Sequence, residues 1–364
     1  MKIMKIKKIL LVGCSLCFIA SLTGCSRQYS AEKLYWQAGQ TARKIQAEKK
    51  GTKLSSEEIE VIINAYHKVV EKCPLTAPAA RAQLIITQAY LSQEEFEKAQ
   101  QELIKITQDY RNLAPQARFM VGSIYEQQGD WDKAVIEYEK VMDLYSATTP
   151  GLQTPIYIAK HYQEGNQFSK AADAYEEAAR RYKQNITDYS GTSLEPAIRN
   201  YLGMTYYHQG KWTDAVEVWQ GIARDYPDSL LSFQLPLFIA EHYLKEEQVP
   251  KAEKLFAESI ERYQKIIDEK PNTPLAVTAQ DFISRSYLLQ KKWDKAAGSL
   301  KTFISNYPDD SRTAICLFTL GTIYREKLNE PEEAKRIYKA LIQKYPETRL
   351  AKVVNKILDN KEEE

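Results

Sequence analysis

The sequence predicts an all-α fold, a solenoid of about seven to eight stacked helical hairpins closed by a C-terminal helix. Three observations predict it. A large apolar residue, two variable residues and an alanine recur along the chain, and the alanines are Ala99, Ala134, Ala171, Ala215, Ala252, Ala296 and Ala334. A tyrosine precedes each of the first six alanines by nine positions, and Tyr-Pro or a near relative closes four units. Self-similarity at such a period is typical of repeat architectures.

The chain begins with a segment of secretory type. Four lysines precede an apolar run at residues 9–20, and a Leu-Thr-Gly-Cys tetrapeptide ends at Cys25. A basic start, a short apolar run and small residues before a cleavage site describe a signal peptide. The tetrapeptide resembles the bacterial lipobox. The resemblance implies that residues 1–24 are removed and that residues 25–29 form a tether, with diacylglycerol and an N-acyl chain on Cys25. The alternative is an ordinary secretory signal that contains a cysteine.

Helical hairpins account for the rest of the chain. Residues 30–74 are predicted to form a degenerate hairpin, residues 75–346 the solenoid, and residues 347–364 a capping helix with an acidic tail. From Trp212, apolar residues fall at steps of 3, 4, 7, 10, 11 and 14, which is one helical face. Gly210 separates this helix from the preceding one, and Pro227 ends it. A lone hairpin cannot bury its apolar face, but stacked hairpins can.

A longer period, equal to two hairpins, lies over the repeat. Tyr157 to Tyr162 reads YIAKHY and Phe238 to Tyr243 reads FIAEHY, and further matches share this offset. We infer a tandem duplication of a two-hairpin block, at about residues 151–231 and 232–312. Seven extra residues follow Tyr182 and Tyr263, which is two helical turns. Either these helices project beyond one edge of the solenoid, or the added turns accommodate a change in superhelical pitch.

The residues of the repeat resemble the tetratricopeptide signature. Leu202-Gly203-x-x-Tyr206, Ala215 and Pro227 follow its L-G-x-x-Y…A…P pattern, and degenerate copies recur along residues 30–346. The resemblance implies a right-handed solenoid that binds proteins. It also implies that the first helix of each hairpin lines a concave surface. Carried over to this chain, that surface predicts contacts from Gln116, Phe119, Ser123, Lys160, Gln163, Asn200, Met204, Tyr207, His208, Asp281, Arg285 and Leu288. Packing between hairpins is the alternative for Met204 and Tyr207.

Composition and motifs argue against several classes of function. Residues 1–24 hold four lysines and no acid, so the remainder carries 46 basic and 48 acidic residues. Such balance argues against nucleic acid as a partner, which needs clustered positive charge. Cys73 and Cys316 are expected to be buried apolar residues, and His161 and His242 to be packing or hydrogen-bonding residues. No catalytic or metal-binding motif is present, so we expect no enzyme activity, cofactor, metal or small-molecule substrate.

We therefore expect a lipid-anchored scaffold that binds protein partners in cell-envelope assembly. The anchor and the repeat together resemble envelope proteins of the BamD and CpoB types. Ser26 after Cys25 favours the outer membrane, facing the periplasm, over the inner membrane, because Asp at this position is associated with inner-membrane retention in lipoproteins. The alternatives are a nutrient- or glycan-binding lipoprotein and a pilotin-like secretion or pilus assembly factor.

Overall fold

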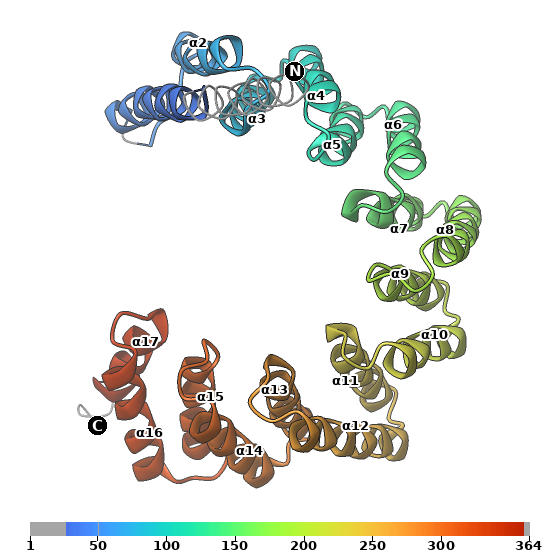
Figure 1. Ribbon diagram of the computed structural model, residues 1–364, viewed down its shortest axis with the longest axis vertical. Helices are drawn as coiled ribbons and strands as arrows, with labels where there is room; N and C mark the ends of the chain where they lie inside the picture. The colour runs from blue at the N-terminus through green and yellow to red at the C-terminus, as the bar shows by residue number, and fades with distance from the viewer. Residues whose placement is uncertain (1–26, 50, 360–364) are drawn as a thin grey trace, which may run out of the picture. The chain divides into compact units, whose positions relative to one another are not determined.

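The computed structural model describes residues 27–49 and 51–359, and within these ranges the chain is helical with no strand (Figure 1). A first helix occupies residues 27–48. The helices that follow are α2 (Ser56–Lys72), α3 (Ala77–Ser92), α4 (Phe96–Asp109), α5 (Ala114–Gln127), α6 (Trp131–Leu144), α7 (Thr149–Glu164), α8 (Phe168–Asp188), α9 (Glu195–His208), α10 (Trp212–Asp225), α11 (Leu230–Lys245), α12 (Val249–Glu269), α13 (Pro274–Leu289), α14 (Trp293–Asn306), α15 (Thr313–Glu326), α16 (Pro331–Lys344) and α17 (Arg349–Asp359).

Consecutive helices pair into eight hairpins within the described residues, and α17 packs against the last pair. The predicted all-α solenoid of hairpins with a C-terminal capping helix is confirmed. The chain divides into two compact units, Met1–Arg181 and Tyr182–Glu364, and the division lies within α8. None of the described helices combines the length and the apolar content that a membrane span requires.

The turn inside each hairpin explains the recurring tyrosine. In seven hairpins the carbonyl of that tyrosine accepts a hydrogen bond of 2.8–3.0 Å from the first residue past the turn, as Tyr206 does from the Lys211 amide. The residue before this donor is left-handed, with φ between 56° and 78°. In six hairpins this is the 6→1 bond of a Schellman motif, and the last hairpin has one further residue in the turn. The left-handed residues are Glu94, Gly129, Asn166, Gly210, Glu247, Lys291 and Asn329.

The turn between successive hairpins uses a hydroxyl side chain. In five turns a Ser or Thr donates to the carbonyl that closes the preceding helix and accepts from an amide in the first turn of the next. Ser229 does this with the Tyr226 carbonyl at 2.9 Å and the Ser232 amide at 3.3 Å. The side chain thus caps one helix while fixing the start of another. The five residues are Thr76, Thr148, Ser229, Thr273 and Thr348.

Small residues bring the two helices of a hairpin together. The alanine of the recurring phrase is at most 4% exposed in all seven hairpins that carry it. In three hairpins a glycine of the first helix faces a large ring of the second helix. A Cβ at Gly203 would lie 2.3 Å from Nε1 of Trp219, which is fully buried. Gly122 and Gly321 meet Tyr138 and Tyr338 in the same way.

The two faces of the solenoid differ in how tightly neighbouring hairpins approach. Among first helices of adjacent hairpins, α5 touches α7, α9 touches α11, and α11 touches α13. The backbones of the second helices α4 and α6, α10 and α12, and α12 and α14 lie farther apart than those of these first helices. In the second unit, Figure 1 shows α9, α11 and α13 on one side and α10, α12 and α14 on the other. These first helices therefore lie on the tighter, inner side of the stack.

The long helices repeat at the period expected from the sequence. The bounds of α11, α12 and α14 follow those of α7, α8 and α10 at the offset of the duplicated blocks. Both α8 and α12 have 21 residues, and most second helices are two turns shorter. The added turns of α12 are part of the core. Ile266 is buried, and it packs with Ile267 and with Leu275 of α13.

Candidate protein-binding surface

The twelve predicted contact residues lie on first helices, in four separate places. On α5, Gln116 is exposed, while Phe119 and Ser123 are half-buried; on α7, Lys160 and Gln163 are both exposed. On α9, Asn200, Met204, Tyr207 and His208 are all half-buried. On α13, Arg285 is exposed, while Asp281 and Leu288 are half-buried. Their role in binding stays a prediction, because no partner is present.

Tyr207 is the centre of a group of rings on α9, α10 and α11, which we call the α9–α11 aromatic cluster: Tyr207, Trp212, Trp219, Phe238 and His242. The Tyr207 ring centroid lies 5.7 Å from that of Phe238 and 5.9 Å from that of His242. Trp212 stacks on His242 at 3.6 Å. Edge-to-face and stacked contacts at these distances are favourable for aromatic pairs.

The cluster has a buried floor and an accessible rim. Trp219 is fully buried and meets Phe238 edge-on at 5.2 Å, whereas Phe238 keeps 36% of its surface exposed. Tyr207, Trp212 and His242 are half-buried. Rigid, partly exposed rings over a packed floor are the side chains that most often dominate the energetics of protein interfaces. This arrangement can therefore bind the side chains of an extended segment.

The equivalent positions of the first unit form a different site. One block length earlier along the chain, the residues at the five cluster positions are Glu126, Trp131, Tyr138, Tyr157 and His161. The Glu126 carboxylate accepts hydrogen bonds from the hydroxyls of Tyr138 at 2.8 Å and Tyr157 at 2.6 Å. Its other oxygen lies 3.0 Å from Nδ1 of His161.

A stacked Trp–His pair is common to both sites. Trp131 stacks on His161 at 3.3 Å, as Trp212 does on His242. Burial, followed by the bond to Glu126, raises the pKa of Tyr157 to about 12, so its hydroxyl stays protonated at neutral pH. The first-unit site is thus closed by its own carboxylate network, whereas the α9–α11 aromatic cluster has no such group. The expectation that both histidines pack or form hydrogen bonds is confirmed.

A group of charged side chains lies on α13 and in the turn before α15. Arg285 bonds Asp281 at 3.0 Å, and Arg312 lies 4.0 Å from the same carboxylate. Arg312 also pairs with Asp310 at 2.8 Å, which raises the already high pKa of the guanidinium. Arg285 stays exposed although it pairs with Asp281, so α13 offers a cation to a bound chain.

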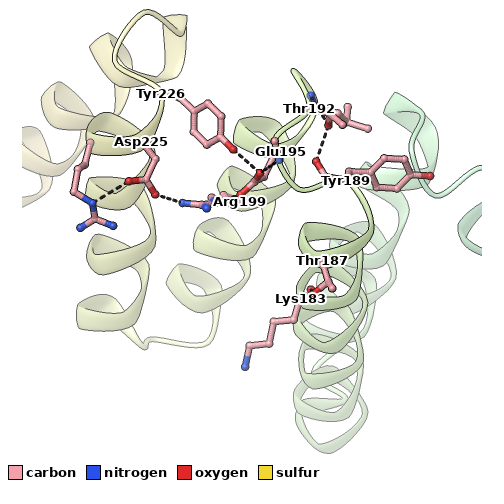
Figure 2. Close-up of polar contacts among 11 residues, drawn as sticks. Lys183, Thr187, Tyr189, Thr192, Glu195, Arg199, Asp225 and Tyr226 are labelled. Atoms are coloured by element: carbon pink, nitrogen blue, oxygen red, sulfur yellow. Dashed lines mark hydrogen bonds and ion pairs between the residues drawn. The ribbon is translucent and has the colours of Figure 1, made fainter.

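A buried carboxylate at the start of α9 belongs to the frame of the hairpin. Figure 2 shows Glu195 between Arg199 and Tyr226. It accepts hydrogen bonds from the Gly191 amide at 2.6 Å, from Arg199 Nε at 2.8 Å and from the Tyr226 hydroxyl, and Arg199 also pairs with Asp225 at 2.7 Å. Burial alone would raise the pKa of Glu195, but these hydrogen bonds outweigh it and hold the pKa below its usual value. The bonds around Glu195 tie the α8–α9 connection to the end of α10.

The outer side of the stack carries two grooves at equivalent places. One, of about 280 Å³, lies over Pro155 and Ile158 between α6 and α8; the other, of about 240 Å³, lies over Pro236 and Ile239 between α10 and α12. Both open between second helices of adjacent hairpins. Each proline stands inside a first helix, where it leaves a carbonyl without its helical donor. The Ser232 carbonyl freed by Pro236 accepts a bond from Arg262.

Groups suited to catalysis are not gathered at the surfaces described above. No cluster of three or more His, Cys, Asp or Glu among residues 27–49 and 51–359 could hold a metal ion. Burial raises the pKa of the Cys316 thiol to about 12, which keeps it from forming a thiolate nucleophile. Cys73 and Cys316 are both free and 4% exposed, so their expected burial is confirmed. The predicted lipidation site, Cys25, lies outside the described residues.

Sequence reasoning did not identify four members of the aromatic cluster, namely Trp212, Trp219, Phe238 and His242, as parts of a candidate binding site. The repeat pattern places Trp212 in the core, the duplication makes His242 a packing residue, and neither assigns Phe238 or Trp219 to the inner face. The offset between the duplicated blocks was an available signal. When the sequence is aligned at this offset, Tyr207 corresponds to Glu126 and Phe238 corresponds to Tyr157.

Several solved structures show a distant likeness. PilW, described as a widely conserved type IV pilus biogenesis factor, is 15% identical with a TM-score of 0.35, covering 66% of this chain and 97% of its own. A tetratricopeptide repeat protein from Parabacteroides merdae is 15% identical with a TM-score of 0.35, covering 80% and 97%. PilF of Pseudomonas aeruginosa is 16% identical with a TM-score of 0.32, covering 64% and 94%. Scores this low carry no argument about function.

The repeat itself is matched directly. No curated protein sequence matches the chain. Two family profiles, both described as tetratricopeptide repeat, do match it. One covers residues 87–147 and 158–229, and the other covers residues 283–310 and 316–348. Together they span more than half of the chain, over the same alternation of helices that the structure shows. The chain belongs to the tetratricopeptide-repeat family.

Proposed function

We propose that the chain is a membrane-anchored scaffold that binds protein partners in the cell envelope, and that the α9–α11 aromatic cluster is its principal contact surface. The observation that carries the proposal is the accessible rim of this cluster. Phe238 stays 36% exposed over a fully buried Trp219, on the inner side of the stack. Tetratricopeptide-repeat proteins bind protein partners, and the inner side is the one whose helices lie closest together.

The chemistry of the surface favours an extended peptide with apolar side chains. The cluster offers aromatic faces without a carboxylate of its own, and Arg285 supplies an exposed cation on α13, the first helix that follows α11 and contacts it. An extended segment running across successive first helices would meet rings first and a charge afterwards. Tyrosine and tryptophan at a protein interface supply a large contact area at a low cost in conformational entropy.

The anchor is the second part of the proposal. The tetrapeptide that ends at Cys25 supports lipidation at that residue, and Ser26 supports the outer membrane with the chain facing the periplasm. Several acyl chains would hold a protein stably on a membrane, whereas one chain binds only marginally. Cys25→Ser should move the protein from the membrane fraction to the soluble fraction and remove the lipid mass from its N-terminal peptide.

Site-specific photo-crosslinking in the native cells tests the binding surface. A photoreactive residue replaces Phe238 or Arg285 on the inner side, and in matched controls it replaces Gln220 or Lys254 on the outer side. We expect the same protein to be captured at both inner positions and at neither outer position. Tyr207→Ala should lower that capture at least several-fold.

Equal capture at inner and outer positions would contradict the assignment of the surface. If Tyr207→Ala lowers both the capture and the melting temperature, the loss of capture would come from lost packing between hairpins and not from a lost contact with the partner. Capture of no protein at any position, with a sugar or other small molecule retained by the purified chain, would favour the alternative of a ligand-binding lipoprotein.

A further inference from the structure

The first helix, at residues 27–48, exposes two aromatic side chains on its outward face. Tyr29 is 73% exposed and Trp36 is 60% exposed. Trp36 is unusual among the five tryptophans, all of which are described, because the other four are buried or half-buried. The two rings stand about two turns apart, so they lie on the same side of the helix.

The opposite side of this helix is fully used by the fold. Ala31 and Ala38 are buried, and Ala38 belongs to a core cluster with Ile63 and Tyr66 of α2. At about 100° per residue, the direction of Tyr29 and Trp36 is opposite to that of the two alanines. The exposed rings are therefore not displaced members of the hairpin core.

Positive charge accompanies the rings. Lys33, Arg43 and Lys44 are exposed, and they lie within about 60° of Tyr29 around the helix axis. The acid at the edge of this face, Glu32, bonds Arg81 of α3 at 2.7 Å. The outward face thus combines two amphipathic rings with three cations.

We propose that this face lies flat on an anionic lipid surface, and the proposal rests on the anchoring of Cys25 proposed above. Tyrosine and tryptophan suit the boundary between headgroups and acyl chains because an apolar ring carries a polar tip. Lysine stems lie along such a boundary while their ammonium groups reach the headgroups. Anionic headgroups complement the three cations.

The position of the helix supports a membrane over another protein. Its described part starts at residue 27, two positions after Cys25, so a lipid on Cys25 brings this part of the helix to the bilayer. A helical distance of about 14 Å separates that start from Trp36. An upright helix would leave Trp36 in water, whereas a helix lying flat brings both rings to the headgroups. Pairing with a second copy through this face would bring like charges together.

Fluorescence quenching of the lipidated full mature protein tests the orientation. The protein is reconstituted in phosphatidylglycerol-containing vesicles whose acyl chains carry bromine near the headgroup end. We expect tryptophan emission to be quenched, Trp36→Phe to remove most of the quenching, and Trp293→Phe to leave it unchanged. Quenching that is absent, or that survives Trp36→Phe, would overturn the proposal.

A second measurement separates this inference from the anchoring itself. Mass spectrometry of the N-terminal peptide reports whether Cys25 carries lipid. The Cys25→Ser protein is then floated with the same vesicles without bromine, and the double variant Tyr29→Ser, Trp36→Ser should lower its partitioning about tenfold. Lys33→Gln with Lys44→Gln should also lower it, whereas Lys254→Gln should not. Partitioning that is insensitive to all of these changes would contradict a lipid-facing helix even if Cys25 is lipidated.

Discussion

Gly203 shows how one position decides the spacing of two helices. Its α-carbon faces the indole of Trp219 so closely that a Cβ would lie 2.3 Å from Nε1 and 2.7 Å from two further ring atoms. Trp219 is fully buried and also forms the floor of the α9–α11 aromatic cluster. The size of the residue at position 203 therefore controls both the hairpin contact and the position of the proposed binding surface.

Gly203→Ala should lower the stability of the protein. The added methyl group forces the indole to move in a packed core, which costs about 1–3 kcal/mol. Gly298→Ala is the matched control, since nothing lies within 4 Å of its Cβ position on α14, and alanine favours a helix by up to about 1 kcal/mol. Thermal unfolding of the two variants should show opposite shifts of the melting temperature. A Gly203→Ala protein as stable as the wild type would contradict the close contact.

Residue identities at the turns show where sequence reasoning stops. An acid such as Glu94, four positions before Lys98, is expected to form an ion pair on a helix surface. In the structure Glu94 is the left-handed residue of the hairpin turn, and Lys98 pairs with Glu95 instead. Only two of the seven left-handed turn positions are glycine, so residue type alone does not reveal them. Their constant distance from the alanine of the repeat would have revealed them.

At the scale of an element, the start of α9 depends on a buried charge. Glu195 is 2% exposed, and its bonds to Arg199, Tyr226 and the Gly191 amide require the carboxylate form. Its pKa is below the usual value of 4.5 because these hydrogen bonds outweigh the cost of burial. A depressed folded-state pKa stabilises the fold above the unfolded value, and that stability is lost as the pH falls through the folded value.

Glu195→Gln should lower stability at neutral pH by about 1–3 kcal/mol, the usual cost of losing hydrogen bonds to a buried charge. The difference from the wild type should persist down to about pH 4.5 and shrink as the pH falls further, because the wild-type carboxyl then becomes neutral too. Melting temperatures measured against pH check this. Glu258→Gln, at a side chain 58% exposed, is the control. A difference that is independent of pH would contradict the role of the charge.

The bounds of elements could be predicted far better than the contacts between them. The apolar face that starts at Trp212, together with Gly210 and Pro227, predicts a helix that runs to Tyr226, and α10 ends one residue earlier, at Asp225. The network around Glu126 could not be predicted, since its members come from α5, α6 and α7 and no local pattern links them. The rings of the aromatic cluster also come from three helices, and of these rings only Tyr207 was predicted as a contact residue, together with Met204 of the same helix α9.

At the scale of the whole molecule, contacts are local. Within each unit, the helices that touch are neighbours along the chain or next but one. The stability of such an array is close to a sum of hairpin terms and nearest-neighbour interfaces. The last hairpin, α15 and α16, therefore depends on α17 to cover its end. Ala351 and Val354 of α17 are fully buried, and both belong to a cluster with Tyr338 and Leu341.

Val354→Asp should unfold the C-terminal end and leave the distant hairpins intact. A buried carboxylate without a partner is strongly unfavourable, so α17 should detach and expose the apolar face of α16. Hydrogen exchange followed by mass spectrometry should show faster exchange in α15–α17 and unchanged protection in α2–α4. Val353→Asp is the matched control, because the neighbouring side chain is already 38% exposed. Val353→Asp should behave like the wild type in either case. Loss of protection in all hairpins of Val354→Asp would contradict the prediction, because the chain would then unfold as one cooperative block.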